Sequence, residues 1–392
     1  MTGNRKHVSR LVAITVLALA AAVTFFAACG SRPPVLVGAI ISETGPTATY
    51  GKQIKRGMDL ALAEVDATGG IMGGRKLEIV YADDASDPKK ALEIAKEMVE
   101  KKQARALIGG VSSAAALGLT SYVNSKGIVL LSPSASTPEL TYAGGEFFFR
   151  VYPSDLVEGQ AMADMARKLG FQTAAIVASK SAFGQGIADV FEGHFESPND
   201  KVVFREDYDG QMTPEMADAI MLKLKDLKPE VVYLAAYDFD VATLLEAMER
   251  AGIGAARFAT SAIKPEIVDV AGAAAERLAF PHASFDLDSG DEAVTRFVTT
   301  YRAKYNEEPG AFAAYGYDTV KIMAAALTRT KIASPGEVAD QLREISYVGI
   351  TGSIDFDSHG DVTSQPHYSV ISKGKAEHFG KVDSAMLPLV LP

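Results

Sequence analysis

The sequence predicts an α/β protein built from two units, each a parallel sheet covered by helices on both faces. Short apolar runs alternate with amphipathic helical segments through the first half of the chain, and the alternation restarts after residue 151. Such alternation is typical of parallel sheets whose strands are connected by helices. The chain has 392 residues, of which 48 % are hydrophobic, which suggests two domains with substantial cores.

The first unit opens with a predicted strand at 35–41 and an amphipathic helix that ends near Ala67. The glycine-rich segment 69–74 comes after that helix. Because a phosphate-binding loop must follow a strand, we interpret this segment as a turn. A second helix begins near Pro88. The other predicted strands of this unit are residues 77–82, 106–108, 128–131 and 147–151.

The second unit repeats the alternation of strands and helices. Its predicted strands are residues 173–178, 202–208 and 231–235. Its predicted helices cover residues 156–169 and 240–251, and two more begin near Gly186 and Pro214. From about Phe280 the alternation stops, and two further helices are predicted at 291–305 and 315–329.

Clusters of small hydroxyl residues follow two consecutive strands of the first unit. After strand 106–108, Gly109 and Gly110 allow a tight turn, and Ser112 and Ser113 precede an Ala- and Leu-rich helix. A helix N-terminus offers free N–H groups and a favourable dipole, so it binds a carboxylate without a formal positive charge. The second cluster, after strand 128–131, consists of Ser132, Ser134, Ser136 and Thr137.

Both clusters are expected in one crevice, because ligands of open α/β sheets bind outside the carboxyl ends of the strands. The alternative is that each serine only caps a helix or stabilises a turn. Two clusters on consecutive strands favour a ligand-binding site.

The N-terminal segment has the layout of an export signal. Basic residues precede an apolar run at 11–28, and Cys29, the only cysteine of the chain, follows two alanines. The arrangement resembles a bacterial lipobox, with Phe26 where leucine is usual. We therefore expect a lipoprotein signal peptide at 1–28, lipidation of Cys29 and a tether at 29–34. A transmembrane anchor over the apolar run is the alternative, and both place the rest of the chain outside the cytoplasm.

Composition and motifs argue against several functions. The net charge is −10 and the chain has no basic tract after the leader, which argues against nucleic-acid binding. No Gly-x-Ser-x-Gly elbow, HExxH motif or P-loop occurs, and no two histidines stand at i and i+4. The paired Asp83 and Asp84 lack a third ligand at a suitable spacing and are interpreted as capping residues. We expect no metal, no cofactor and no enzymatic activity, and hence a binding protein.

Several motifs, in order, resemble the branched-chain amino-acid (Leu/Ile/Val) type of periplasmic substrate-binding protein that feeds an ABC transporter. The likeness extends over essentially the whole chain after the leader. The motifs are VLVGAIISETGPTATYG from Val35, IGGVSSAAAL from Ile108, LLSPSASTPEL from Leu130, FGQGIA from Phe183, VVYLAAY from Val231 and GITGSIDFDSHGD from Gly349.

The resemblance implies the type I periplasmic binding protein fold, in which two doubly wound parallel-sheet lobes are joined by three crossovers and close over a ligand. The crossovers would lie near Val151, Pro281 and Ser353. The N-terminal lobe would be residues 34–151 plus 283–353, and the C-terminal lobe residues 152–282 plus 354–392.

The resemblance also implies roles for individual residues. Ser113 would bind the α-carboxylate of the ligand, Ser136 its α-carboxylate and ammonium, and Ser134 and Ala135 would contribute backbone contacts. Tyr50, Phe183 and Tyr237 would form aromatic walls, which cover an apolar ligand body at low entropic cost. Ser112, Asp238 and Ser261 complete the candidate ligand-binding residues.

One departure concerns the acidic residue with which the family pairs the ligand's ammonium. It should follow the strand near Phe258, but Thr260, Ser261 and Ala262 stand there. A buried ammonium without a counter-charge costs several kcal/mol. Either Asp238 or Glu266 takes over this role, or the ligand is not an α-amino acid. Relatives of this family bind aromatic or aliphatic carboxylates, amides and urea.

The resemblance therefore implies an extracytoplasmic solute-binding lipoprotein of an ABC transporter, which captures a small amino acid or carboxylate in the interlobe cleft. Its partners would be the ligand, a membrane permease and a lipid anchor through Cys29, and we expect a monomer. The alternative is a ligand sensor of the same fold that presents an aromatic or aliphatic acid, an amide or urea to a membrane signalling partner.

Overall fold

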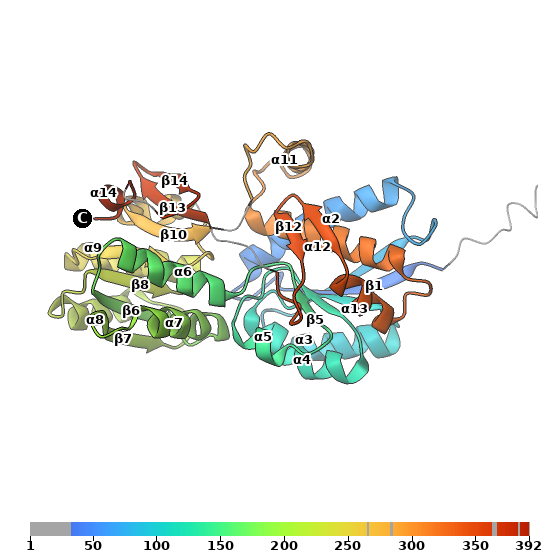
Figure 1. The fold of residues 1–392 in the computed structure, drawn as a ribbon, viewed down its shortest axis with the longest axis horizontal. Coiled ribbons are helices and arrows are strands. Elements are labelled where there is room, and N and C mark those ends of the chain that lie inside the picture. Colours follow the sequence, from blue (N-terminus) through green and yellow to red (C-terminus); the bar gives the residue numbers. More distant parts are fainter. Residues whose placement is uncertain (1–32, 265, 283–284, 363–366, 383–384, 392) are drawn as a thin grey trace, which may run out of the picture.

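The computed structural model describes residues 33–264, 266–282, 285–362, 367–382 and 385–391, and it confirms the predicted α/β class. Two largely parallel sheets lie in separate lobes side by side, each covered by helices (Figure 1). Cys29 and the expected signal peptide lie outside the described residues. None of the helices within the described ranges is long and apolar enough to cross a bilayer.

The sheet of the first lobe has five parallel strands in the order β2-β1-β3-β4-β5. Three of them are buried along their whole length, as expected for strands covered on both faces. The strands are β1 (Val35–Ile41), β2 (Leu77–Asp83), β3 (Ala106–Gly109), β4 (Leu130–Ser132) and β5 (Phe148–Arg150). The connecting helices are α2 (Ala48–Ala67), α3 (Pro88–Lys96) with a π-helical turn (Glu97–Lys101), α4 (Ser113–Lys126) and α5 (Glu139–Ala143).

The sheet of the second lobe has seven strands in the order β14-β13-β10-β9-β8-β6-β7. All neighbours run parallel except β13 and β14, which extend one edge as antiparallel strands. The strands are β6 (Thr173–Ser179), β7 (Lys201–Tyr208), β8 (Val231–Ala235), β9 (Ala256–Ala259), β10 (Leu278–His282), β13 (His367–Ser372) and β14 (Lys375–Phe379). The helices are α6 (Asp155–Lys168), α7 (Ala182–Phe195), α8 (Pro214–Lys225), α9 (Asp238–Ala251), α10 (Ile267–Ala271), a 3₁₀ turn (Gly272–Ala275) and α14 (Leu387–Val390).

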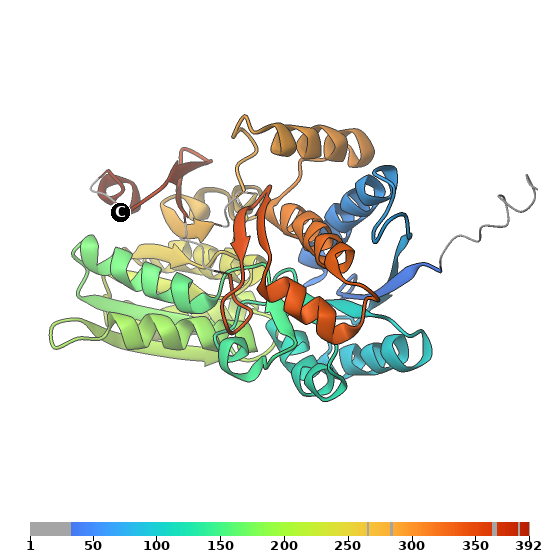
Figure 2. The same ribbon diagram turned by 45° about the vertical axis from the view of Figure 1, so that its right-hand side comes forward.

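After β10 the chain returns to the first lobe, where α12 packs along α2 (Figure 1, Figure 2). Two glycines allow this close approach. A Cβ atom at Gly57 would lie 1.8 Å from the carbonyl oxygen of Ala313, and one at Gly316 would lie 2.2 Å from that of Ile54. The returning elements are α11 (Glu292–Tyr305), α12 (Ala311–Arg329), α13 (Pro335–Arg343) and the hairpin β11 (Ser346–Gly349) and β12 (Gly352–Asp355).

The chain thus passes between the lobes after β5, after β10 and between β12 and β13. The segment after β12 still contacts the first lobe, because the ring of Phe356 lies 5.3 Å from that of Phe149 and Arg150 N–H donates to the carbonyl of Gly360. The lobe boundaries proposed from the sequence stay predictions.

Several helices begin earlier than the sequence predicted, among them α7 and α12. Helix α7 begins at Ala182 rather than near Gly186, because the Ser181 hydroxyl caps it and accepts from Gly184 N–H at 3.0 Å. Helix α12 begins at Ala311 rather than at 315. A serine before a glycine-rich stretch is a weak start signal, which explains the first difference.

Candidate ligand-binding site

A cavity lies between the two lobes, at the carboxyl ends of strands from both sheets. It has about 370 Å³ of space not filled by protein atoms, part of which opens to solvent. Most of its lining follows β1, β3 and β4 in the first lobe or β6, β8 and β9 in the second, as expected for an open α/β sheet. The lining residues are Thr47, Tyr50, Val111, Ser113, Ser134, Ser136, Tyr152, Phe183, Tyr237, Ser261, Ala262 and Phe312.

Ser113 connects the two serine clusters. It is the first residue of α4, and its hydroxyl oxygen accepts hydrogen bonds from the backbone N–H of Ser136 at 3.3 Å and of Thr137 at 3.2 Å. Its neighbour Ser112 caps the same helix by accepting from Ala115 N–H at 3.1 Å. The hydroxyl and amide groups that could bind a carboxylate therefore already lie together at one helix N-terminus.

The loop after β4 is fixed by its own serines. The Ser132 hydroxyl donates to the carbonyl of Gly110 at 3.1 Å and accepts from Ala135 N–H at 3.0 Å. The Ser134 hydroxyl donates to the carbonyl of Val111 at 2.8 Å. These bonds tie the loop after β4 to the loop after β3, so the two clusters form one surface.

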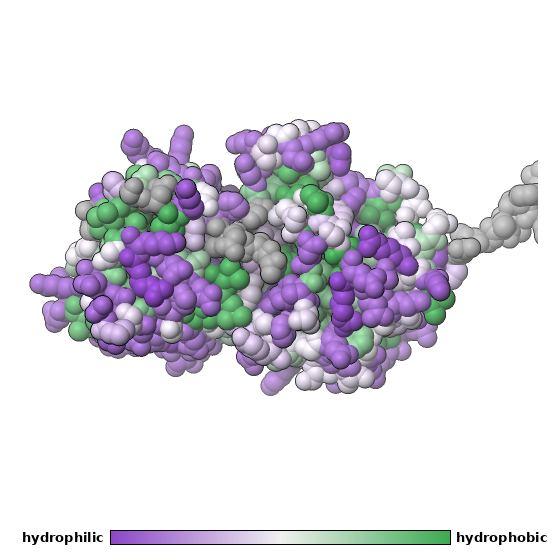
Figure 3. Space-filling model, viewed as in Figure 1, coloured by the Kyte–Doolittle hydropathy of each residue, from purple (hydrophilic) through white to green (hydrophobic). Residues whose placement is uncertain are grey.

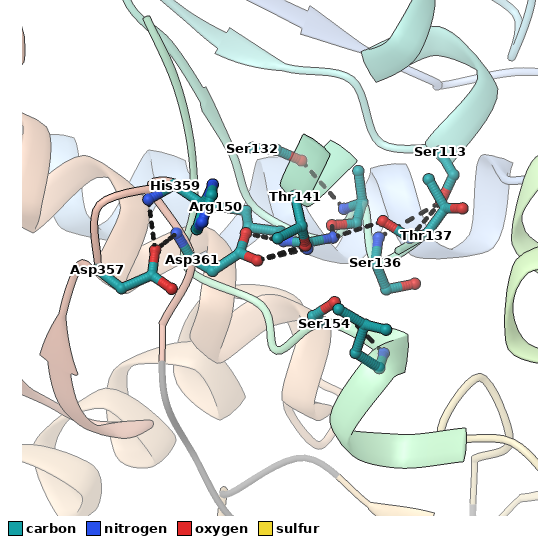
Figure 4. A network of polar contacts seen from close by, with 12 residues as sticks. Ser113, Ser132, Ser136, Thr137, Thr141, Arg150, Ser154, Asp357, His359 and Asp361 are labelled. Carbon is teal, nitrogen blue, oxygen red and sulfur yellow. Dashed lines mark hydrogen bonds and ion pairs between the residues drawn. The ribbon is translucent and has the colours of Figure 1, made fainter. Parts of the chain in front are cut away.

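Behind this loop lies a buried ion pair (Figure 4). Arg150, at the end of β5, donates to both carboxylate oxygens of Asp361, at 2.6 Å and 2.9 Å. The same guanidinium donates to the carbonyls of Ala135 and Thr137 and to the Thr141 hydroxyl. Arg150 thus connects the serine loop to the segment that leads into the second lobe. Bidentate geometry with further acceptors is the arrangement in which a buried pair is stable.

Aromatic rings surround the rest of the cavity. Tyr50 packs edge-on against Phe312, with ring centroids 4.7 Å apart, and Tyr152 stacks on the same phenylalanine at 5.7 Å. From the second lobe, Phe183 stacks on Tyr237 at 5.0 Å. The cavity therefore offers polar groups at one end and an apolar enclosure elsewhere, which is typical of sites for small amphipathic ligands.

Hydrogen bonds join the two lobes across the cavity. The Tyr50 hydroxyl donates to a carboxylate oxygen of Asp238 at 3.0 Å and lies 3.3 Å from the carbonyl oxygen of Ala262. Tyr152 lies on the segment that crosses between the lobes after β5, and its hydroxyl donates to the Ser261 hydroxyl at 2.8 Å. These contacts hold the lobes close together in this structure.

Two buried acids lie beside the second lobe's part of the site. Glu158 accepts a hydrogen bond from Ser261 N–H at 2.9 Å, and burial raises its pKa to about 7 against the opposing bonds from Ser261. Asp155 is fully buried at the start of α6, and within the described part of the chain neither carboxylate oxygen has a donor in hydrogen-bond geometry. Burial and then the charge of Glu158 raise the pKa of Asp155 well above its usual range, although the Ser136 hydroxyl and Arg150 oppose the shift.

The candidate residues fall into two groups in the structure. Ser112 caps α4, the backbone of Ala135 bonds to Ser132 and Arg150, and Asp238 lies at the start of α9, so none of the three lines the cavity. Glu266, the other acid considered for a ligand ammonium, is exposed. Candidates that do line the cavity are Tyr50, Ser113, Ser134, Ser136, Phe183, Tyr237 and Ser261.

Several residues that line the cavity were not predicted from the sequence. Phe312 comes from α12, far along the chain, and nothing in its local sequence marks it as part of a site. Tyr152 could have been found from its place directly after β5, at a predicted crossover. Within the described ranges, no group of three or more His, Cys, Asp or Glu side chains is arranged to hold a metal ion.

Comparisons with known proteins agree with this architecture. Residues 34–375 match the model of a family described as periplasmic binding protein. The chain is 28 % identical over 365 residues to the leucine-, isoleucine-, valine-, threonine- and alanine-binding protein of Pseudomonas aeruginosa, which covers 92 % of this chain and 95 % of that protein. It is 28 % identical over 337 residues to the Leu/Ile/Val-binding protein of Escherichia coli, over 84 % of this chain and 88 % of that one.

Solved structures of solute-binding proteins have the same fold. The branched-chain amino acid transporter substrate binding protein LivJ of Streptococcus pneumoniae, in complex with isoleucine, matches with a TM-score of 0.78 and 26 % identity, over 88 % of this chain and 98 % of that one. A solute-binding protein of an ABC transporter from Rhodopseudomonas palustris, in complex with benzoate, has the same fold, with a TM-score of 0.79 and 22 % identity over 90 % and 99 % of the two chains.

Proposed function

Because the chain belongs to the periplasmic binding protein family, we propose that it captures a small carboxylated solute between its lobes and delivers it to an ABC permease. The family is extracytoplasmic, and its members are solute-binding proteins of transporters rather than enzymes. The chain is of the branched-chain amino acid transporter type. What remains to be proposed is the ligand, the residues that bind it and the anchoring of the chain.

The observation that carries the proposal is the polar end of the cavity. Ser113 begins a helix and holds the N–H groups of Ser136 and Thr137 with its hydroxyl oxygen. A carboxylate at this place would receive hydroxyl and amide donors and the positive end of the dipole of α4. The Arg150 network behind the loop keeps these donors in position before a ligand arrives.

The ligand body would lie among the aromatic side chains. Tyr50 and Phe312 come from the first lobe, and Phe183 and Tyr237 from the second, so a ligand in the cavity would contact both lobes. Contacts to both lobes favour the closed arrangement over an open one, because they are made fully only when the lobes meet. Capture would thus couple binding to hinge closure.

The relatives support a small acid as the ligand but leave its class open. One is named for leucine, isoleucine, valine, threonine and alanine, and one structural neighbour holds isoleucine. Another neighbour of the same fold holds benzoate. An α-amino acid or a simple carboxylate would both use the serine end of the cavity.

We also propose that the mature chain is a monomeric lipoprotein anchored through Cys29. The support is the lipobox-like sequence before that cysteine. Incorporation of labelled palmitate into the wild-type chain but not into Cys29→Ala would support the anchor, and equal labelling of both would contradict it.

The binding function is tested by calorimetric titration of the soluble form that begins at Gly30. The panel should contain branched-chain amino acids, aliphatic and aromatic carboxylates, amides and urea. At 100 times its dissociation constant, a true ligand adds about 2.7 kcal/mol to the free energy of unfolding, so a thermal-shift screen identifies candidates first. If no carboxylate binds, the proposal is wrong.

A further inference from the structure

Building on the proposed carboxylate capture, we propose that Lys264 makes the cavity select carboxylates that lack an amino group. Lys264 stands just after β9, two residues beyond Ala262 of the cavity lining. Its ammonium forms a salt bridge with Asp238. Asp238 is one of the two acids that could replace the missing acidic residue after β9. The inference concerns the class of ligand, and the serine end of the cavity serves either class.

Both carboxylate oxygens of Asp238 are already engaged. One accepts from the Tyr50 hydroxyl at 3.0 Å and from Phe239 N–H at 2.9 Å. The other pairs with the ammonium nitrogen of Lys264 at 3.0 Å. The side chains of Lys264 and Asp238 are only 18 % and 27 % exposed, so water screens this pair less than a pair on the open surface. A ligand ammonium that approached Asp238 would compete with Lys264 for its carboxylate.

Lys264 also contacts the wall of the cavity. Its ammonium nitrogen lies 4.7 Å from the centroid of the Tyr50 ring, within the range of a cation–π interaction. Tyr50 is one of the rings that line the cavity. A second cation brought to this ring by a ligand would be repelled by Lys264, whereas an uncharged apolar group would not.

The other acids near the cavity are poor partners for an ammonium. Glu158 binds Ser261 N–H, and burial raises its pKa to about 7. Asp155 does not line the cavity, and burial, together with the charge of Glu158, raises its pKa well above its usual range. Glu266 is exposed. No aspartate or glutamate is among the described residues that line the cavity.

A carboxylate without an amino group needs no acidic partner in the cavity and brings no second cation close to Lys264. Its charged end would bind at Ser113 and Ser136, and its body would meet aromatic rings, hydroxyl groups and the apolar side chains of Val111 and Ala262. Specificity is a difference of affinities, and here it would come from an element that opposes the wrong ligand as much as from contacts to the right one. Lys264 would be that element.

The test uses two pairs of ligands that differ only in the α-amino group: 4-methylpentanoate against leucine, and 3-phenylpropanoate against phenylalanine. Titration calorimetry at pH 7.5 measures all four with the wild-type chain, with Lys264→Met and with Lys264→Met/Asp238→Asn. We expect the wild type to prefer at least one amino-free acid by 10-fold or more. Lys264→Met frees Asp238 and should shift that ratio at least 10-fold towards the amino acid, and the double variant should reverse the shift.

Lys55→Met is the matched control. Lys55 also forms a salt bridge, with Glu43 at 2.8 Å, and also lies over a tyrosine ring, that of Tyr81 at 5.2 Å. The control should leave the ratio unchanged. A wild type that prefers the amino acids, or a ratio that Lys264→Met does not move, would overturn the inference. So would amino-acid binding that is lost in Asp155→Asn, because Asp155 would then be the partner of the ammonium.

Failure of the inference can be told from failure of the proposed function. If the acids bind and Ser113→Ala weakens all of them alike while the ratio is insensitive to Lys264, carboxylate capture stands and only the ligand class is wrong. If none of the acids binds to the wild-type chain, the proposed function and this inference both fail.

Discussion

The two sides of the cavity differ in whether their buried charged groups are paired with an opposite charge. On the first lobe's side, the buried Arg150 and Asp361 neutralise each other, and hydroxyl and amide groups of the two serine clusters bond to one another. On the second lobe's side, Asp155 and Glu158 are buried without a salt bridge among the described residues, and their pKa values are raised. The visible surface around both lobes is mostly hydrophilic (Figure 3).

This difference suggests that the two sides of the cavity have different roles in ligand binding. The first side is fixed by a buried, bidentate ion pair, so its carboxylate-binding geometry should be rigid. The second side supplies rings and groups whose charge depends on pH, so it should control closure and ligand class. Four variants test this comparison.

The largest effect is expected for Arg150→Met. It leaves the Asp361 carboxylate buried without a partner, which should lower the free energy of unfolding by about 3–5 kcal/mol. Urea unfolding followed by circular dichroism measures the loss as a lower midpoint. Arg150→Met/Asp361→Leu removes both charges and should recover much of the stability. A single variant within about 1 kcal/mol of the wild type would show that the ion pair does not fix the first side.

The next effect is on affinity and is expected for Ser113→Ala. Loss of a hydrogen bond to a charged ligand group should cost about 1.5–3 kcal/mol, roughly 10- to 150-fold in the dissociation constant. Ser125→Ala is the control, since it removes a hydroxyl that donates to the carbonyl of Tyr122 at the far end of the same helix. If the two variants bind the ligand with equal affinity, the Ser113 hydroxyl does not contribute to ligand binding.

Glu158→Gln tests the second side through pH. The folded protein holds the Glu158 proton more tightly than the unfolded chain, since burial raises its pKa from 4.5 to about 7. The stabilising contribution is therefore complete below about pH 4.5 and is lost as the pH rises to about 7, with a slope of at most about 1.4 kcal/mol per pH unit. The variant should flatten this part of the stability curve, measured by urea unfolding from pH 4 to 8. Parallel curves would mean that Glu158 ionises normally.

The smallest effect is expected for Tyr50→Phe. It removes the interlobe bonds to Asp238 and Ala262, which should weaken closure by about 0.5–1.5 kcal/mol. Small-angle scattering should show a larger radius without ligand, and the ligand should dissociate faster. The control is Tyr305→Phe, whose hydroxyl bonds to the carbonyl of Arg56 on α2. If both variants have the wild-type radius, the tyrosine contact does not hold the lobes together.

The serine end of the site could be predicted because its signals are local. Strand, glycine turn, serine cap and helix follow one another between Ile108 and Leu117, and the same order of strand and serines recurs after Leu130. Parallel strands then bring both clusters to one edge of the sheet, as the structure shows through Ser113. The local order of residues, together with the rule that parallel strands end at the same edge of a sheet, was sufficient to predict this part of the site.

The strands β13 and β14 and helix α13 were not predicted from the sequence. Strand β13 pairs antiparallel with β10, and its burial follows from that distant partner rather than from its own pattern. Nor did the local sequence around Glu158 and Asp361 indicate that both would be buried. Such positions depend on which segments meet, and sequence periodicity does not carry that information.

The sequence by itself determined the α/β class, the two units and the serine clusters, because backbone preferences and apolar periodicity act over a few residues. Only the tertiary structure decided which charges meet. Arg150 pairs with Asp361 across 211 positions, Tyr50 with Asp238 across 188, while Asp238 is shared with Lys264. Electrostatic energy depends on distance and burial in space, so the charge balance that we propose selects the ligand exists only once the two lobes are folded and closed.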